Sequence, residues 1–276
     1  MSKQPYPGLR PFMQNEIDIF FGREDQVDEK LMKLEDSHFL MVLGPSGCGK
    51  SSLVRTGLLN ALKSGFMMSA GTKWRIADFK PGDAPLWNLS AGLYTALKPE
   101  RDATNSDILQ EYREVADWHA ILSEGIDGLM RIVKDAQLPD DTNLLLLADQ
   151  FEEIFRFRDL VPKGTNKEDT KYESEDFVTL LLEAARQKKC PIFVIMTMRT
   201  GFLERCFEFD TLPMTINRSQ FLTPMLNEEQ LISAIVGPAK VFGGNVKSDL
   251  VDRLISDMSP NPDDLPLLQH ALMRIW

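Results

Sequence analysis

The sequence has few of the residues that build disulfide frameworks and zinc sites. Its 276 residues include only three cysteines and three histidines, and all six lie far apart. Zinc and disulfide motifs need several such residues at short, regular spacings, so neither kind of site is expected. Scattered free cysteines are typical of a reducing compartment, and the sequence therefore predicts a cytoplasmic protein.

Long apolar runs and an excess of basic charge are also missing. No stretch of about 18 apolar residues occurs, and the opening MSKQPYPGLR lacks the apolar segment of a secretion signal. A membrane partner is therefore not expected. The chain has 41 acidic and 31 basic residues, a net charge of −10. Nucleic-acid binders gain much of their affinity from basic residues that neutralise phosphates, so this balance disfavours a nucleic-acid partner.

What is present is an alternation of apolar runs with amphipathic segments. Continuous apolar runs at 39–43, 144–148 and 192–196 predict strands buried on both faces, residues 75–79 a weaker strand, and 214–216 a candidate fifth. Helices are expected at 24–34, 52–63, 86–97 and 117–136. This order predicts an α/β three-layer sandwich with a mostly parallel sheet over residues 25–222, preceded by an arm at 1–24.

Two further segments have a different character. Residues 162–176 are polar and charged, which predicts a surface loop. Residues 223–276 show three short helical patterns, from 227, 248 and 264, which predict a small all-α lid subdomain. The apolar face of the last pattern is still running at Trp276, without a helix stop signal, so we expect this chain to be part of a longer one.

A glycine-rich motif follows the first apolar run. Residues 44–51 read GPSGCGKS, which fits the phosphate-loop pattern G-x-x-x-x-G-K-[ST] between a strand and a helix. Glycines let consecutive N–H groups surround an anion, the lysine contacts the β- and γ-phosphates, and the serine hydroxyl binds magnesium. The expected phosphate-binding residues are Gly44, Pro45, Ser46, Gly47, Cys48, Gly49, Lys50, Ser51 and Ser52. The motif predicts a P-loop NTPase that binds ATP or GTP with Mg²⁺.

The second apolar run ends in Asp149, which is followed by Gln150 and, after Phe151, by Glu152 and Glu153. A carboxylate at the end of a strand beside a phosphate loop binds Mg²⁺ through its water shell, so Asp149 joins Ser51 as a candidate metal ligand. A glutamate just beyond it can orient or deprotonate the attacking water. Glu152 is the first candidate base and Glu153 the second, whereas the plainer interpretation is that both favour a helix start.

Arg199 closes the third apolar run, and Phe21, Gly22 and Arg23 precede the first helix. An arginine at a strand end can stabilise a γ-phosphate, or it can form a salt bridge with a carboxylate after Asp149; both interpretations remain open. Gly22 permits close backbone approach, and Phe21 either lies along a nucleotide base or packs in the core.

The motifs in this order resemble those of a STAND NTPase, and in particular the novel STAND NTPases of the bacterial branch associated with WD repeats. The resemblance covers nearly the whole chain. It is carried by PYPGLRPF at 5–12, FGRE at 21–24, the phosphate loop, DQFEE at 149–153, TMR at 197–199 and LPLLQHAL at 265–272.

The resemblance implies roles that the composition does not. Gly22 and Arg23 are expected at the edge of the adenine, Pro266 against the base, and Arg199 as the sensor arginine. Gln150 stands where many related ATPases carry a second acidic residue, which makes Glu152 the expected base and slow hydrolysis the expected rate.

A STAND NTPase is a signalling switch, closed with ADP and able to form homo-oligomers with ATP. The resemblance therefore implies attached effector and repeat sensor domains outside this chain. A nucleotide-holding scaffold without turnover is the alternative that Gln150 keeps open. A P-loop kinase is disfavoured because residues 223–276 contain only two arginines, and a nucleic-acid-linked ATPase is disfavoured by the charge.

Overall fold

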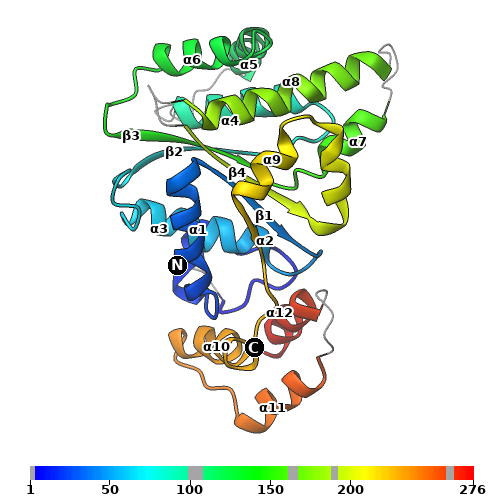
Figure 1. The fold of residues 1–276 in the computed structure, drawn as a ribbon. Coiled ribbons are helices and arrows are strands. Elements are labelled where there is room, and N and C mark those ends of the chain that lie inside the picture. The colour runs from blue at the N-terminus through cyan, green and yellow to red at the C-terminus, as the bar shows by residue number, and fades with distance from the viewer. Residues whose placement is uncertain (1–3, 99–107, 161–166, 188–191, 259–263) are drawn as a thin grey trace. The chain divides into compact units, whose positions relative to one another are not determined.

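The computed structural model describes residues 4–98, 108–160, 167–187, 192–258 and 264–276 (Figure 1). The strands are β1 (Phe39–Gly44), β2 (Lys73–Phe79), β3 (Thr142–Ala148), β4 (Ile192–Arg199) and β5 (Gln220–Leu222). The helices are η1 (Gln14–Ile19), α1 (Glu24–Ser37), α2 (Lys50–Ser52), η2 (Leu53–Leu58), α3 (Leu59–Lys63), α4 (Pro85–Leu97), α5 (Ile108–Leu122), α6 (Ile126–Asp135), α7 (Glu153–Asp159), α8 (Lys167–Ala185), η3 (Thr200–Glu208), α9 (Leu212–Arg218), α10 (Glu228–Val241), α11 (Ser248–Ser256) and α12 (Asp264–Ile275). Among these helices none is both long and apolar enough to cross a membrane.

The five strands form one sheet in the order β2-β3-β4-β1-β5. The pairs β2–β3 and β3–β4 are parallel, with Ile76 opposite Leu145 and Leu145 opposite Phe193. All six residues of β1 and six of the seven in β3 are buried. Strands covered on both faces need apolar residues at every position, which is why these runs do not alternate. The expected α/β fold with a mostly parallel sheet is confirmed.

Three expectations about secondary structure were wrong. Residues 214–216 lie in helix α9, and the fifth strand is β5, whose three residues are too short to leave a pattern in the sequence. The single helix expected at 117–136 is two helices, because a turn separates the end of α5 at Leu122 from the start of α6 at Ile126. Gly125 in this turn has a φ of 76°, which a helix cannot contain. Of the stretch 162–176 predicted as a surface loop, residues 162–166 lie outside the part of the chain that the structure describes, and the rest is helical from residue 167, where α8 begins. Residues 168–171 of α8 are all charged or polar and give no apolar periodicity, so the sequence pattern did not predict this part of the helix.

Contacts within the chain divide it into two compact units. Unit 1 comprises residues 1–32, 43–68 and 221–276, and unit 2 comprises residues 33–42 and 69–220. In unit 2, α4 packs on β2 and α8 packs on β4, with α5 and α6 forming an outer layer (Figure 1). Strands and covering helices therefore form successive layers within this unit.

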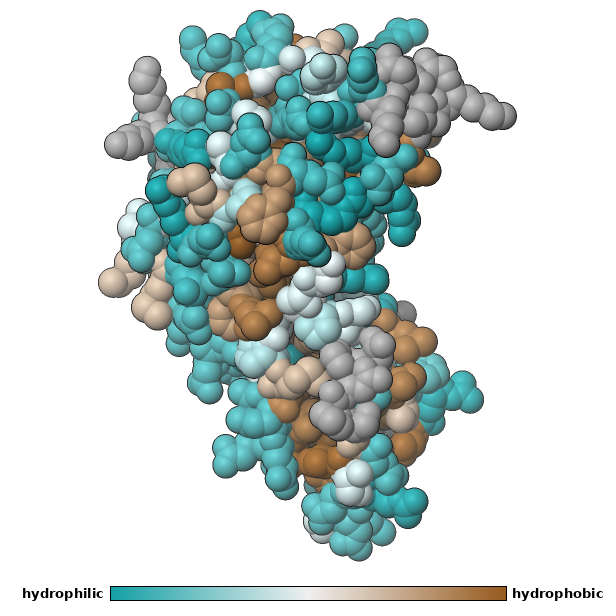
Figure 2. All heavy atoms as spheres, turned by 45° about the vertical axis from the view of Figure 1, so that its right-hand side comes forward, coloured by the Kyte–Doolittle hydropathy of each residue, from teal (hydrophilic) through white to brown (hydrophobic). Residues whose placement is uncertain are grey.

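Unit 1 includes the phosphate loop and the C-terminal helices α10, α11 and α12. The core of these helices contains a residue from the other end of the chain, because Tyr6 is 1% exposed among Ile235, Leu268 and Leu272. Its hydroxyl donates a hydrogen bond of 2.5 Å to the carbonyl oxygen of Ile235. This core is small, and other apolar side chains at the end of the chain are exposed, among them Leu267, Ile275 and Trp276. Brown, hydrophobic residues are visible on the face of the molecule drawn in Figure 2.

Candidate nucleotide-binding site

The phosphate loop connects β1 to a helical run that begins at Lys50. Gly47 and Gly49 have φ angles of 74° and 90°, which residues with a Cβ atom rarely adopt. Gly49 is also the N-cap of α2, so the backbone turns sharply just before the helix. A Cβ atom on Gly44 would lie 2.6 Å from the Cys48 sulfur, which explains the glycine at the start of the loop. The predicted loop is confirmed as a strand-to-helix turn with these special dihedral angles.

Lys50 at the end of this loop and Ser52 just after it each form hydrogen bonds with the backbone. The ammonium of Lys50 donates to the carbonyl oxygens of Gly44 at 3.0 Å and Pro45 at 2.7 Å, so the lysine bends back over the loop. The hydroxyl of Ser52 accepts a hydrogen bond of 3.1 Å from the backbone N–H of Phe12. The first residues of unit 1 are thereby attached to the helix that follows the loop.

The helical run after the loop contains an unusual segment. Between α2 and α3, residues Leu53–Leu58 form a π-helix, a rare conformation that is frequently found at functional sites. Gly57 lies within it, and a Cβ atom there would come within 2.9 Å of Val27 and 3.5 Å of the Phe20 ring. The helix predicted at 52–63 is therefore present, with a wider turn and a close approach that only glycine permits.

Arg23 is a buried arginine that joins three parts of unit 1. Its guanidinium donates to the carbonyl oxygen of Cys48 in the phosphate loop at 2.8 Å and to that of Pro224 at 2.8 Å. It also donates to the Gln26 side chain at 2.8 Å. Burial lowers the pKa of Arg23 to about 10, so the group stays protonated at neutral pH. Arg23 thus couples the loop to the chain segment that leads into α10.

A cavity of about 280 Å³ lies beside the phosphate loop within unit 1. Its lining is mostly apolar and consists of Arg23, Cys48, Met225, Leu226, Leu231, Ile255, Met258 and Leu265. The composition suits a flat, apolar ring system such as a purine. Except for Arg23, Cys48 and the motif leucine Leu265, nothing in the sequence singled out these residues, because apolar side chains give no signal that separates a pocket from a core.

The other residues expected at the base lie near this cavity in sequence without lining it. The ring of Phe21 packs against α10, where a Cβ atom on Gly237 would come within 2.6 Å of it. A Cβ atom on Gly22 would lie 2.5 Å from the carbonyl oxygen of Gln230, so a glycine is needed for this close approach. Pro266 is half-buried at the start of α12, next to Leu265, which does line the cavity.

In unit 2, Asp149 begins a tight turn after β3. Its carboxylate is 1% exposed and accepts a hydrogen bond of 2.5 Å from the hydroxyl of Thr197 on β4. The same hydroxyl accepts a bond of 3.0 Å from the backbone N–H of Gln150, and the Thr197 carbonyl accepts one of 2.7 Å from Phe151. Thr197 therefore orients both the aspartate and the turn, and no local sequence pattern predicts this role.

Gln150 takes a left-handed conformation in this turn, with a φ of 58°. This conformation costs an ordinary residue about 1–2 kcal/mol, so the replacement Gln150→Gly should leave the free energy of unfolding unchanged or raise it by up to about 1 kcal/mol. The β-branched replacement Gln150→Val should lower it by about 1–2 kcal/mol. Denaturant unfolding measures both changes, and equal losses in the two variants would contradict the strain.

The two candidate glutamates have different partners. The Glu152 carboxylate forms a salt bridge of 3.0 Å with the Nε atom of Arg199 and accepts a bond of 3.3 Å from the Arg199 backbone N–H. The Glu153 carboxylate instead accepts a bond of 3.1 Å from the backbone N–H of Gly82. Of the two interpretations of Arg199, the salt bridge is the one formed in this structure. The hydrogen bond from the Gly82 N–H joins Glu153 to the turn before α4.

The oxygen donors named for magnesium fit the chemistry of that ion. Mg²⁺ prefers hard oxygen ligands and is usually held by one or two carboxylates, waters and the phosphates of the substrate. Asp149 supplies a buried carboxylate, and Ser51 is half-buried in the first turn of α2. Within the described residues no group of three or more His, Cys, Asp or Glu side chains forms a metal cage.

Comparisons with solved structures show the same fold in other proteins. The chain is similar to a Walker-type ATPase of Pyrococcus abyssi, with 16% identity, a TM-score of 0.55, and 96% of this chain and 71% of that one covered. It is also similar to the ORC2 protein of Aeropyrum pernix in its ADPNP–ADP complexes, with 12% identity, a TM-score of 0.53, and 92% and 60% covered. At these identities the likeness shows the fold alone.

Comparisons by sequence are more specific. No curated protein matches the chain. The family model described as Novel STAND NTPase 1, however, matches residues 5–276, from the PYPGLRPF run to the last helix. This range includes the phosphate loop, the Asp149 turn and Arg199, and it agrees with the resemblance that these motifs indicated. The chain therefore belongs to the Novel STAND NTPase 1 family.

Proposed function

We propose that this chain is a signalling switch that binds ATP with Mg²⁺ and hydrolyses it slowly. The backbone of residues 44–51 and the ammonium of Lys50 bind the phosphates. Ser51 and Asp149 hold the magnesium ion, which neutralises charge on the phosphates when it is bound. Glu152 accepts the proton of the attacking water, and Arg199 responds to the γ-phosphate.

The observation that supports slow turnover is the ion pair between Glu152 and Arg199 at 3.0 Å. A general base must accept a hydrogen bond from water, and a sensor must contact phosphate, yet each of these two groups is engaged by the other. Turnover therefore requires that the pair separates, and its separation adds to the barrier. In this proposal the γ-phosphate competes for Arg199 and so makes the Glu152 carboxylate available.

The cavity beside Arg23 and Cys48 supports the assignment of adenine as the base. Its walls are formed mostly by leucine, isoleucine and methionine, which favour the flat faces of a purine. In the full-length protein, we propose, ATP binding favours homo-oligomerisation and activates attached effector domains under the control of a repeat sensor.

A turnover assay tests this function directly. The purified chain should release phosphate from ATP with Mg²⁺ at a low rate that added DNA does not change. Stimulation by DNA would support a nucleic-acid-linked ATPase, and transfer of the phosphate to an added acceptor would support a kinase. Tight ATP binding with no phosphate release over many hours would support a nucleotide-holding scaffold.

Arg199→Ala tests the role of Arg199 as a γ-phosphate sensor. If Arg199 contacts the γ-phosphate, the replacement should weaken ATP binding about tenfold and ADP binding less than about twofold, because only ATP carries that group. Calorimetric titration with both nucleotides measures the difference. The exposed Arg218, replaced in the same way, is the control and should change neither affinity. Equal losses of affinity for ATP and ADP would contradict a contact with the γ-phosphate and would support only the structural salt bridge with Glu152.

A further inference from the structure

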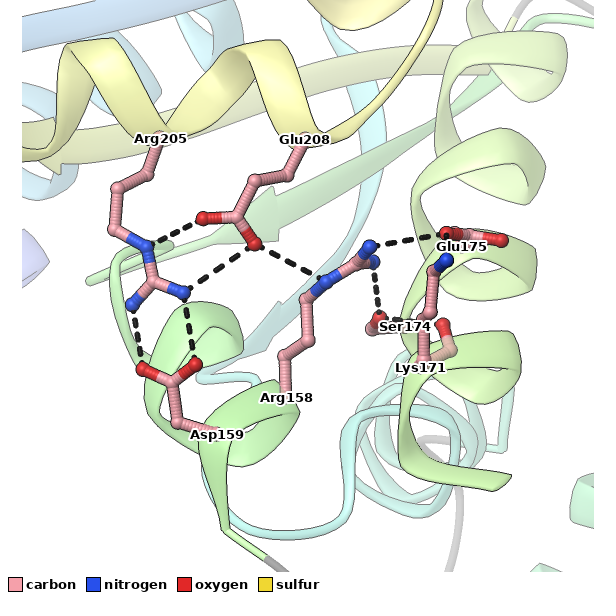
Figure 3. A network of polar contacts seen from close by, with 7 residues as sticks. All are labelled: Arg158, Asp159, Lys171, Ser174, Glu175, Arg205 and Glu208. Carbon is pink, nitrogen blue, oxygen red and sulfur yellow. Dashed lines mark hydrogen bonds and ion pairs between the residues drawn. The ribbon is translucent and has the colours of Figure 1, made fainter. Parts of the chain in front are cut away.

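Two short helices of unit 2 begin at the residues that the proposed chemistry uses. Glu152 is the N-cap of α7, and Arg199 is the N-cap of η3. The salt bridge between them therefore joins the two helices where they begin. The carboxylate of Asp159, the last residue of α7, accepts two hydrogen bonds from Arg205 of η3, at 2.7 and 3.0 Å (Figure 3). Helix α7 is thus joined to η3 by an ion pair at each of its own ends.

Aromatic contacts join the same helices between these ends. Phe155 of α7 is fully buried, and its ring stacks on Phe202 of η3 with 5.9 Å between centroids and 9° between planes. The guanidinium of Arg205 lies 4.9 Å from the centre of the Phe155 ring. Since a seven-residue helix is only about 10 Å long, these contacts constrain α7 along its whole length.

The outer ion pairs continue into a network that includes α8 (Figure 3). Glu208 accepts a hydrogen bond of 2.6 Å from the Nε atom of Arg205 and forms an ion pair of 3.1 Å with Arg158. Arg158, whose side chain is 11% exposed, in turn contacts Ser174 at 3.1 Å and Glu175 at 3.0 Å, both on α8. Networks of partly buried pairs orient side chains more strongly than isolated surface pairs do. Arg205 donates to one residue of each helix, to Asp159 of α7 and to Glu208 of η3, while Arg158 of α7 pairs with the same Glu208.

We propose that Arg205 is a positioning residue for ATP hydrolysis. Through its two bonds to Asp159, the last residue of α7, it fixes the orientation of α7 relative to η3, and with it the placement of Glu152 relative to Arg199. Because an error of about 1 Å in a reacting group can lower a rate by up to about a hundredfold, a helix that tilts at one end changes the chemistry at the other. The inference rests on the proposed function in assigning the base to Glu152.

Steady-state ATP hydrolysis by the whole chain tests this inference. Arg205→Met keeps the apolar stem over Phe155 and removes the charge, so kcat should fall about tenfold while KM changes less than about twofold. Arg205→Lys keeps the charge but loses the paired bonds to Asp159, so kcat should fall by a smaller factor. The control Lys73→Met removes an exposed ion pair with Asp141 elsewhere in unit 2 and should leave kcat and KM unchanged.

The same substitution in a chain that already carries Glu152→Gln separates a positioning role of Arg205 from a general effect on stability. If Arg205 acts through Glu152, Arg205→Met should lower kcat no further in a Glu152→Gln chain, because the base is already lost. An unchanged kcat in Arg205→Met and Arg205→Lys, with Glu152→Gln still impaired, would overturn the inference and leave the proposed base intact. A further full decrease in the Glu152→Gln background would overturn it as well.

A measurement that does not depend on ATP hydrolysis tests the positioning role of Arg205 even if Glu152 is not the base. A double-mutant cycle on unfolding, with Glu152→Gln and Arg199→Met, measures the coupling between these two side chains. Repeated in the Arg205→Met background, the coupling should fall by about half or more, because the helices no longer hold the pair in register. An unchanged coupling would show that Arg205 does not position the pair. If Glu152→Gln leaves turnover unchanged, the base assignment fails, and this cycle alone decides on Arg205.

Discussion

Replacing Lys50 by alanine is expected to weaken ATP binding by at least about 100-fold. A hydrogen bond between charged groups contributes about 1.5–3 kcal/mol, and loss of about 2.7 kcal/mol corresponds to a factor of 100 in the dissociation constant. In this structure the ammonium lies against the carbonyl oxygens of Gly44 and Pro45, within the loop that is proposed to hold the phosphates. Calorimetric titration with Mg-ATP measures the effect.

A lysine of the same helical run provides the control for this variant. Lys63 contacts the side chain of Gln14 at 3.0 Å on the surface and lies outside the loop. Lys63→Ala should therefore bind ATP as the unmodified chain does. Circular dichroism should show that both variants are folded. An unchanged affinity in a folded Lys50→Ala chain would remove the phosphate loop from the proposed site.

Replacing Glu152 by glutamine is expected to lower ATP turnover by about 10² or more while ATP still binds, because the amide cannot accept the proton of the attacking water. The substitution keeps the size of the side chain and a hydrogen-bond acceptor for Arg199. It removes the charge that stabilises the salt bridge of 3.0 Å between the two residues. Single-turnover phosphate release, with binding measured separately, distinguishes lost chemistry from lost affinity.

The neighbouring glutamate is the matched comparison. Glu153 accepts a hydrogen bond from the Gly82 backbone, so Glu153→Gln should lower stability slightly and leave turnover within about threefold. The reverse outcome, a large loss of turnover in Glu153→Gln alone, would move the base by one residue. If neither variant loses turnover, the water is oriented by another group, and Gln150 becomes the candidate.

The sequence alone determined the class of fold and the position of the phosphate loop. The runs that became β1, β3 and β4 are apolar at every position, and this pattern is specific because only strands covered on both faces need it. The loop was equally clear, since its special dihedral angles at Gly47 and Gly49 can be met only by a few residue types. In both cases the burial or the dihedral angles restrict residues that are adjacent in the chain, so a short stretch of sequence is enough to predict the feature.

Tertiary structure decided which partner each polar side chain has. Nothing in the sequence around Glu152 and Glu153 distinguishes a residue that pairs with Arg199 from one that binds the Gly82 amide, because both partners lie more than 40 positions away along the chain. The same holds for the hydroxyl of Thr197 on β4, which donates to the carboxylate of Asp149 at the end of the neighbouring strand β3. It also holds for Tyr6, which belongs to the core of the C-terminal helices. Such contacts form because the folded backbone brings together residues that are far apart in the sequence. Local sequence patterns do not show which distant residues will become neighbours.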